Sequence, residues 1–85
     1  MRVQNKQAES SATDRNYENL ANAIILTAVK DYRGALQRLK RNPHSEGAKS
    51  SKNEVERFFH SGLFSVLTSV DADMLIRKLN AEVDE

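Results

Sequence analysis

Residues 53–67, with the sequence NEVERFFHSGLFSVL, hold all three phenylalanines of this chain and decide its fold. At about 100° per residue, the apolar side chains of a helix through this segment share one broad side. That side consists of Val55, Phe58, Phe59, Gly62, Leu63, Val66 and Leu67. Burying one Phe or Leu side chain contributes about 1.5–3 kcal/mol. We therefore expect this amphipathic helix to supply the largest share of the core.

Ser61 and Gly62 interrupt this helix, which the apolar pattern places at about residues 52–67. Two weak helix formers in a row offer little local resistance to bending. The sequence therefore predicts one of two forms. Either the helix is kinked near residues 61–62, or it breaks there and Ser61 caps a separate short helix.

The longest predicted helix lies on the N-terminal side, over residues 17–41, where no proline interrupts the chain. Apolar side chains recur there every three or four residues and cover about half the circumference. They are Tyr17, Leu20, Ala21, Ile24, Ile25, Ala28, Val29, Tyr32, Ala35, Leu36 and Leu39. Such a helix has about seven turns and a length of roughly 37 Å. Residues 1–13 contain a single valine among mostly polar residues, so we predict a flexible tail there.

Helix breakers and caps mark the ends of the remaining elements. Asn42 and Pro43 end the first helix, because the residue before a proline is pushed out of the α region. A polar loop of about ten residues is expected next, with the serine at position 50 or 51 capping the second helix. Asp71 is expected to cap a last helix over about residues 72–83, where apolar side chains again share a face.

These elements predict an all-α fold, a small antiparallel helical bundle in which one long helix packs against two or three shorter helical segments. Eighty-five residues allow a single domain, which we place at residues 14–85. The chain has no cysteine, which excludes disulfides and thiolate metal sites. A bundle this small without a cross-link has a narrow margin of stability.

The sequence shows no signal for a membrane location. The longest apolar run, residues 23–26, is far shorter than the roughly 20 residues that a membrane-spanning helix needs. The first residues are polar and lack the apolar core of a signal peptide. We expect a soluble, cytoplasmic protein without membrane contact.

Asp71, Asp73 and His60 are the side chains that invite a chemical interpretation, and each has a simpler one. The two aspartates suit the start of a helix, where negative charge is favourable, and no third metal ligand lies near them in the sequence. His60 points away from the main apolar side of its helix, as a partly exposed residue does. No glycine-rich phosphate loop and no paired-histidine motif is present. We therefore expect no enzymatic activity, catalytic residue, metal or cofactor.

Basic residues gather in the middle of the chain. Residues 30–52 carry seven basic and two acidic side chains, whereas residues 53–85 carry three basic and seven acidic ones. The simplest interpretation is a solvated helix face, and the alternatives are contact with nucleic-acid phosphates or with an acidic protein partner. The candidate residues for a phosphate or acidic-partner contact are Lys30, Arg33, Gln37, Lys40, Lys49 and Lys52.

Three large apolar side chains do not fit the apolar sides of their helices. Leu26 and Met74 fall outside those sides, and Phe64 lies at the edge of its own. Each alone is ordinary for a protein surface, but three in so small a bundle indicate apolar surface left for a partner. Leu26, Phe64 and Met74 are therefore the candidate partner-facing residues, and the partner is another protein or, in a homodimer, a second copy of the chain.

Two stretches carry a resemblance to known proteins, AIILTAVKDYRGALQRLKRNP at residues 23–43 and EVERFFHSGLFSVLTSVDADMLIRKL at residues 54–79. They resemble small, uncharacterised helical proteins carried by phages and prophages of Gram-positive bacteria. The shared order is an alanine-rich helix with a DYR-like element, a basic helix end before NP, an ERFF-like aromatic helix and a D-x-D-x-LI segment. The resemblance covers about residues 20–80 and implies a setting in a bacterial host cell, where such proteins commonly bind a host or phage protein. It supplies no functional residues.

The leading functional hypothesis is a non-enzymatic helical protein–protein interaction module. In the setting that the resemblance implies, it would be a phage-encoded regulator or inhibitor that binds a host protein, for example of a defence system. One alternative is a nucleic-acid-binding accessory protein that uses the basic face of the first helix. Another is a self-associating structural or assembly component.

Overall fold

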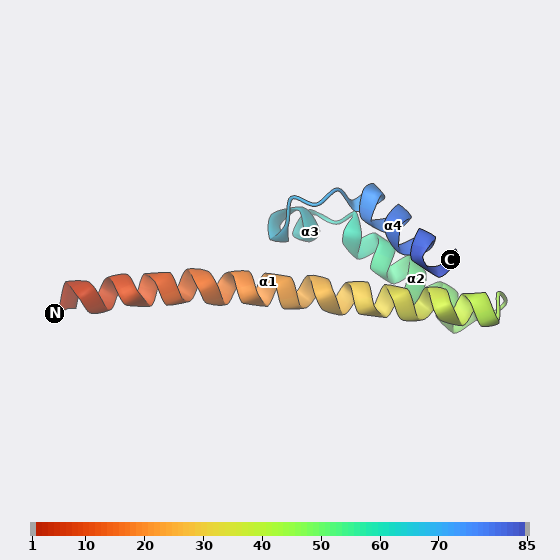
Figure 1. Ribbon diagram of the computed structural model, residues 1–85, viewed down its shortest axis with the longest axis horizontal. Helices are drawn as coiled ribbons and strands as arrows, with labels where there is room; N and C mark the ends of the chain where they lie inside the picture. The colour runs from red at the N-terminus through yellow and green to blue at the C-terminus, as the bar shows by residue number, and fades with distance from the viewer. Residues whose placement is uncertain (1, 85) are drawn as a thin grey trace.

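The computed structural model describes the backbone of residues 2–84 and the side chains of residues 16–83. Within these limits every regular element is a helix, and no strand occurs. Its elements are α1 (Arg2–Arg41), α2 (Glu46–Phe59), α3 (Gly62–Leu67) and α4 (Ala72–Asp84). The long helix α1 packs against the three shorter ones, which all lie on one side of it (Figure 1). The predicted all-α bundle is therefore confirmed.

Helix α1 is longer than the sequence pattern predicts, because it begins at Arg2 and not near Tyr17. Neither proline nor glycine occurs between residues 2 and 33, so no residue of that stretch ends the helix once it has formed. The N-terminal half of α1 extends beyond the other helices (Figure 1), and the molecule measures 62 × 23 × 19 Å. The predicted flexibility of residues 1–13 stays a prediction, and the side chains of residues 1–15 lie outside the described part.

No helix in the described part of the chain is long and apolar enough to cross a membrane.

The turn between α1 and α2 is much shorter than the predicted ten-residue loop. The Asn42 backbone N–H still donates to the carbonyl of Arg38 at 2.8 Å, and the Ser45 N–H then donates to the carbonyl of Asn42 at 3.1 Å. Ser45 is the N-cap of α2, since its Oγ accepts the backbone N–H of Ala48 at 3.2 Å. The predicted start of this helix near residue 52 is thus wrong. A nearer serine satisfies the first free N–H groups of the helix.

The predicted interruption at Ser61 and Gly62 is present as a complete break. Ser61 Oγ donates to the carbonyl of Phe58 at 2.6 Å and accepts the backbone N–H of Phe64 at 3.3 Å. The same hydroxyl therefore helps to close the end of α2 and caps the start of α3. The predicted cap of the last helix is confirmed as well, because Asp71 Oδ1 accepts the N–H of Met74 at 2.9 Å.

The core lies where α1, α2, α3 and α4 meet, and aromatic rings fill its centre. Tyr32, Phe59 and Phe64 are fully buried. The ring centroids of Phe59 and Phe64 are 5.4 Å apart in an edge-to-face arrangement, and those of Tyr32 and Phe59 are 5.7 Å apart. Val29, Leu36 and Leu79 complete the buried cluster.

Phe64 was a candidate partner-facing residue in the sequence, and the structure corrects this. Its side chain is 2 % exposed. On one continuous helix it would lie at the edge of the apolar side, but the break at Ser61 gives α3 an axis of its own. That new direction turns Phe64 inward against Phe58 and Phe59.

Candidate functional site

The exposed apolar surface of α1 is a stripe that the shorter helices leave uncovered. Tyr17, Leu20 and Ile24 are 53 %, 60 % and 37 % exposed. Their spacing of three and four residues places them within an arc of about 60° on the helix. We call these three residues the α1 ridge. The α1 members of the buried cluster, Val29, Tyr32 and Leu36, lie further along the helix, so most of the ridge faces solvent.

A groove between α1 and α2 continues the α1 ridge. Its first part has a volume of about 250 Å³ and is lined mainly by apolar groups, including Ile24, Ala28, Val55 and Phe58. Ile24 belongs to both the ridge and the groove, so the two form one surface. We call this hollow the α1/α2 groove.

The second part of the α1/α2 groove is more polar and has a volume of about 340 Å³. Asp31 and Glu54 line both parts, and Arg38 lines the second. Gly34 lies on the same side of α1, and a Cβ atom built on it would meet no atom within 4 Å. The groove is therefore open above Gly34, and charged side chains stand along its walls.

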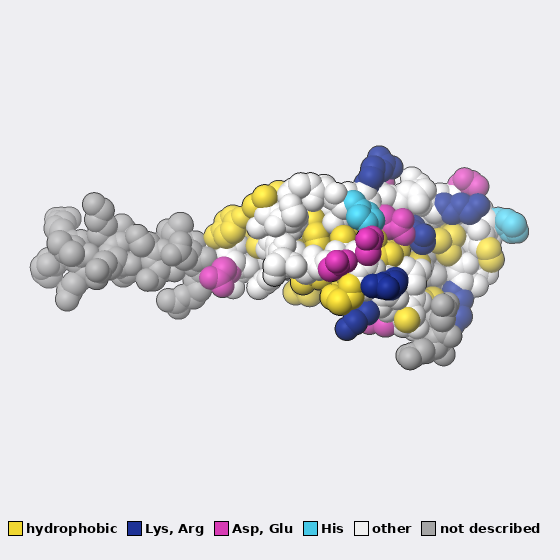
Figure 2. Space-filling view, turned by 90° about the horizontal axis from the view of Figure 1, so that it is seen from above, with side chains coloured by type: hydrophobic (Ala, Val, Ile, Leu, Met, Phe, Trp, Pro, Cys, Tyr) yellow, Lys and Arg dark blue, Asp and Glu magenta, His cyan; other side chains and the backbone are white. Residues whose placement is uncertain are grey.

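The short helix α3 adds apolar surface at the same end of the bundle. Leu63 and Val66, three residues apart, are both exposed. Figure 2 shows hydrophobic side chains gathered where α1 emerges from the other helices. Among the described side chains, five of the eight large exposed apolar ones therefore belong to the ridge and α3, namely Tyr17, Leu20, Ile24, Leu63 and Val66.

The structure separates the other two candidate partner-facing residues from the α1 ridge. Leu26 is 65 % exposed, but its position on α1 is roughly 150° away from the centre of the ridge. Met74 lies in the first turn of α4 and is also exposed. The sequence pattern assigned Tyr17, Leu20 and Ile24 to the apolar side of the first helix, and an apolar side half a circumference wide is more than two short helices cover. That width was the signal of a partly exposed face.

Two residues of the predicted basic face are bound to α4. Arg33 makes a two-pronged contact with Glu82, with Nε–Oε1 at 2.8 Å and Nη2–Oε2 at 3.1 Å. The hydrogen bond and the opposite charge raise the pKa of Arg33 and lower that of Glu82. Lys40 Nζ donates to the backbone carbonyl of Val83 at 2.8 Å. Both basic side chains therefore help to hold α4 against α1.

The remaining members of the basic face do not form one continuous stripe. Lys52 Nζ is 2.9 Å from Glu56 Oε2, and Lys49 is 3.8 Å from Glu46. Lys30 lines the α1/α2 groove, whereas Gln37 lines a separate hollow beside α4. Contact with nucleic acid stays a prediction, and four of its six candidate residues already have partners within the molecule.

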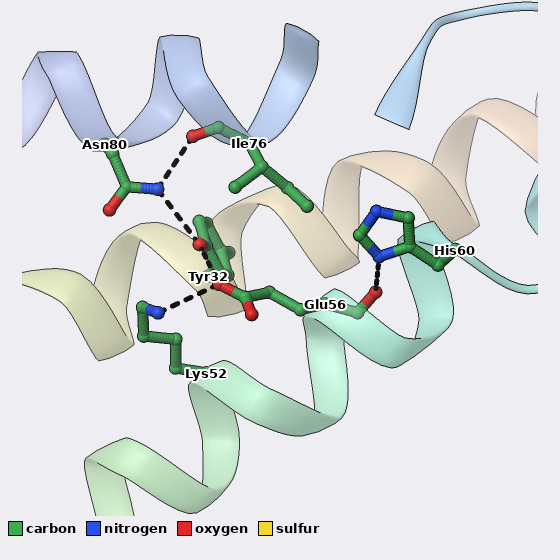
Figure 3. A network of polar contacts seen from close by, with 6 residues as sticks. All are labelled: Tyr32, Lys52, Glu56, His60, Ile76 and Asn80. Atoms are coloured by element: carbon green, nitrogen blue, oxygen red, sulfur yellow. Dashed lines mark hydrogen bonds and ion pairs between the residues drawn. The ribbon is translucent and has the colours of Figure 1, made fainter. Parts of the chain in front are cut away.

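A polar network joins α1, α2 and α4 beside the core (Figure 3). The Tyr32 hydroxyl donates to Glu56 Oε2 at 2.6 Å and accepts from Asn80 Nδ2 at 3.1 Å. Asn80 also donates to the carbonyl of Ile76 at 2.8 Å, and Lys52 binds the same Glu56 oxygen. Each of these four side chains is bonded to another member of the cluster, so the network is a structural contact between the three helices.

The network shifts the pKa of two of its members. Burial, followed by the hydrogen bond to Glu56, raises the pKa of Tyr32 to about 12, although the hydrogen bond from Asn80 acts in the opposite direction. For Glu56 burial is the largest effect and favours the protonated form. The hydrogen bonds from Tyr32 and Lys52 and the nearby positive charges together outweigh it, so the pKa of Glu56 is lowered.

His60 and Asp73 form a contact at the surface between the end of α2 and the start of α4. His60 Nε2 is 2.8 Å from Asp73 Oδ1, and His60 Nδ1 is 3.0 Å from the carbonyl of Glu56. The hydrogen bond to Asp73 and the bond to the carbonyl raise the pKa of His60. Among the described residues no three His, Cys, Asp or Glu side chains are grouped so that they could hold a metal ion.

Comparisons with known proteins do not identify a functional site in this chain. No family model, curated protein or solved structure matches the chain. The α1 ridge and the α1/α2 groove join exposed apolar side chains to an apolar hollow in one surface, and we take them as the candidate functional site.

Proposed function

We propose that this chain is a helical protein–protein interaction module that binds a protein partner through the α1 ridge and the α1/α2 groove. The observation that carries the proposal is the ridge itself. Tyr17 and Leu20 are more than half exposed on the same helix that buries Val29, Tyr32 and Leu36 in the core. Exposed apolar groups that form one surface are typical of interaction sites.

The shape of the surface suits a helical segment of the partner. Two parallel rows of side chains, on α1 and α2, form its walls and leave an open strip between them. An amphipathic helix commonly binds such a groove with apolar side chains spaced three and four residues apart. The apolar part around Phe58 would accept those side chains, and Asp31, Glu54 and Arg38 would select the charges beside them.

The biological setting of the proposal rests on the resemblance to phage-encoded helical proteins. In that setting the partner is a protein of the bacterial host, for example of a defence system, and binding regulates or inhibits it. The chain then acts by covering a surface of its target and needs no catalytic residue of its own.

Two matched substitutions test the proposed surface. Leu20 and Leu26 are the same residue type on the same helix, they are similarly exposed, and they lie on different sides. The tagged full-length chain captures proteins from a lysate of a Gram-positive bacterium, and mass spectrometry identifies them. A partner of the ridge is captured by the wild type and by Leu26→Glu, but not by Leu20→Glu. Circular dichroism confirms that both variants are folded.

The opposite pattern of capture would contradict the proposal. If every specifically captured protein is lost with Leu26→Glu and retained with Leu20→Glu, the partner binds the other side of α1. If capture is the same for both variants and the wild type, the interaction surface lies elsewhere.

A further inference from the structure

We infer that a second copy of this chain covers the α1 ridge, in a two-fold dimer that places the ridge of each copy in the α1/α2 groove of the other. The inference rests on the proposed binding surface and names its occupant when no other partner is present. Its support comes from the shape of the surface, its extent and the distribution of charge around it.

The surface is complementary to itself. It contains a convex part, Tyr17 and Leu20, and directly beside it a concave apolar part around Val55 and Phe58. A two-fold axis across α1 between Leu20 and Ile24 would bring each convex part over the concave part of the other copy. Such an interface is isologous and closed, so it stops at two copies.

The two copies of α1 would run antiparallel in this arrangement. With the two-fold axis midway between positions 17 and 28, Tyr17 of one copy and Ala28 of the other lie at the same level along the paired helices. Each tyrosine ring would therefore lie beside the other copy's apolar groove, with its hydroxyl toward the solvent. Asp31 and Glu54 border the far side of the apolar part, and their carboxylates would stay hydrated at the rim.

The extent of the surface suits a weak dimer. From Tyr17 to Arg38 the ridge and the groove follow α1 for roughly 30 Å, and one helix diameter is about 10 Å. A strip of this size offers several hundred Å² per copy, whereas each partner of a standard stable interface buries about 800 Å². We therefore expect a reversible dimer with a dissociation constant in the micromolar range.

The other exposed apolar position on α1 is a poor site for a second copy. Leu26 has Asn22 one turn before it and Lys30 one turn after it, and it is the one large exposed apolar side chain on that side of the described part of α1. A symmetric contact there would bury little apolar surface. The α1 ridge combines three apolar side chains with a groove and carries no charge of its own.

Sedimentation equilibrium of the purified full-length chain tests the inference. We expect the wild type to pass from a monomer of 9.6 kDa to a dimer as its concentration rises through the micromolar range. Leu20→Glu should raise the dissociation constant at least about tenfold, because a carboxylate would enter the apolar groove. Leu26→Glu should leave it unchanged within about twofold. A wild type that stays monomeric throughout, or a dimer that is weakened only by Leu26→Glu, would overturn the inference.

Cross-linking gives a second readout of the same arrangement. The chain has no cysteine, so single variants Ile24→Cys and Leu26→Cys differ only in the side of α1 that they label. A short bismaleimide should link two copies through Cys at position 24 and not at position 26. Links at position 26 alone, or equal links at both, would contradict the inference. If the wild type is monomeric while Leu20→Glu still abolishes capture of another protein, the dimer is wrong and the proposed function stands.

Discussion

At the scale of single residues, Tyr32 is where the apolar core meets the polar network. Its ring packs edge-on against Phe59, and its hydroxyl bonds to Glu56 and Asn80 on two other helices. A buried polar group that loses its partner costs about 1–3 kcal/mol. The network therefore favours the one arrangement of α1, α2 and α4 in which the hydroxyl is paired on both sides.

Removing the hydroxyl of Tyr32 should destabilise the bundle without disturbing its shape. Tyr32→Phe keeps the ring and deletes one hydrogen bond to a carboxylate and one from an amide. We expect the free energy of unfolding to fall by roughly 1–3 kcal/mol, as measured by urea denaturation. A variant as stable as the wild type would show that the network contributes no net stability.

The same substitution should change the response to acid. The pKa of Glu56 in the folded state lies below its ordinary value of 4.5. Around pH 4.5 the folded protein therefore binds fewer protons than the unfolded chain. The contribution of Glu56 to the free energy of unfolding is fully present above that pH. It is lost as the pH falls through the pKa of Glu56 in the folded state. In Tyr32→Phe the pKa of Glu56 should move upward, and stability should fall less steeply below about pH 5. Urea denaturation at several pH values measures this slope, and equal slopes would contradict the assignment.

Two neighbouring phenylalanines should differ in their effect on stability. Phe59 is 1 % exposed at the centre of the aromatic cluster, whereas Phe58 is only partly buried at the edge of the α1/α2 groove. We expect Phe59→Ala to cost about 3–5 kcal/mol and Phe58→Ala clearly less. Thermal denaturation compares them, and the reverse order would mean that the groove side of α2 is the better packed one.

At the scale of elements, side-chain contacts between helices that are distant in the sequence set how those helices are oriented. Arg33 holds α1 to Glu82 on α4, and His60 joins the end of α2 to Asp73 at the start of α4. Both contacts are exposed, so each adds little stability by itself. Their effect is to orient α4, whose apolar side closes the core.

The contact of His60 with α4 should depend on pH. Its pKa is raised in the folded state above the ordinary value of 6.5. The stability from this contact is therefore fully present below about pH 6.5 and is lost as the pH rises through the folded pKa. We expect His60→Gln to remove that part of the pH dependence, with a small amplitude because both side chains are exposed. Thermal melts on either side of this range measure it, and an unchanged profile would show that His60 is not the responsible group.

Gly34 should be replaceable within α1 with a gain in stability. It lies in a regular helix without a positive φ, and a Cβ there would meet nothing within 4 Å. Gly34→Ala should therefore stabilise the chain by about 0.5–1 kcal/mol. Gly47→Ala is the matched control, because its Cβ would lie 3.3 Å from Arg38 Nη2 and the gain should be smaller. Urea denaturation of both variants decides the comparison.

At the scale of the whole molecule, the lengths of the helices do not match. Helix α1 spans 40 residues, whereas α2, α3 and α4 together cover only one side of its C-terminal part. The apolar side of α1 begins at Tyr17, before the bundle does. Surplus apolar surface at the open end of the bundle follows directly from this mismatch.

If the exposed apolar surface of α1 binds a second copy of the chain, the melting temperature should depend on protein concentration. If the folded state associates and the unfolded chain does not, the melting temperature rises with protein concentration. We expect this rise for the wild type and not for Leu20→Glu, in calorimetric scans over about a hundredfold range of concentration. A wild-type melting temperature independent of concentration would indicate that the bundle is stable as a monomer.

The sequence by itself determined the features that depend on neighbouring residues. The period of apolar residues predicts the helices, Ser61 and Gly62 predict the break, and Asp71 predicts the start of α4. Each signal acts over three or four residues, through helix periodicity or through a capping hydrogen bond. Where two local signals competed, as Ser45 did with the later serines, sequence reasoning chose the wrong one.

The tertiary structure alone decided which apolar residues are buried and which charges are paired. Phe64 turns inward because α3 has its own axis, and Leu20 stays exposed because no helix reaches it. Arg33 and Glu82 meet across 49 positions of sequence. Such pairs depend on how whole helices lie against one another, and the sum of many weak packing contacts sets that arrangement. No pattern within one helix contains that information.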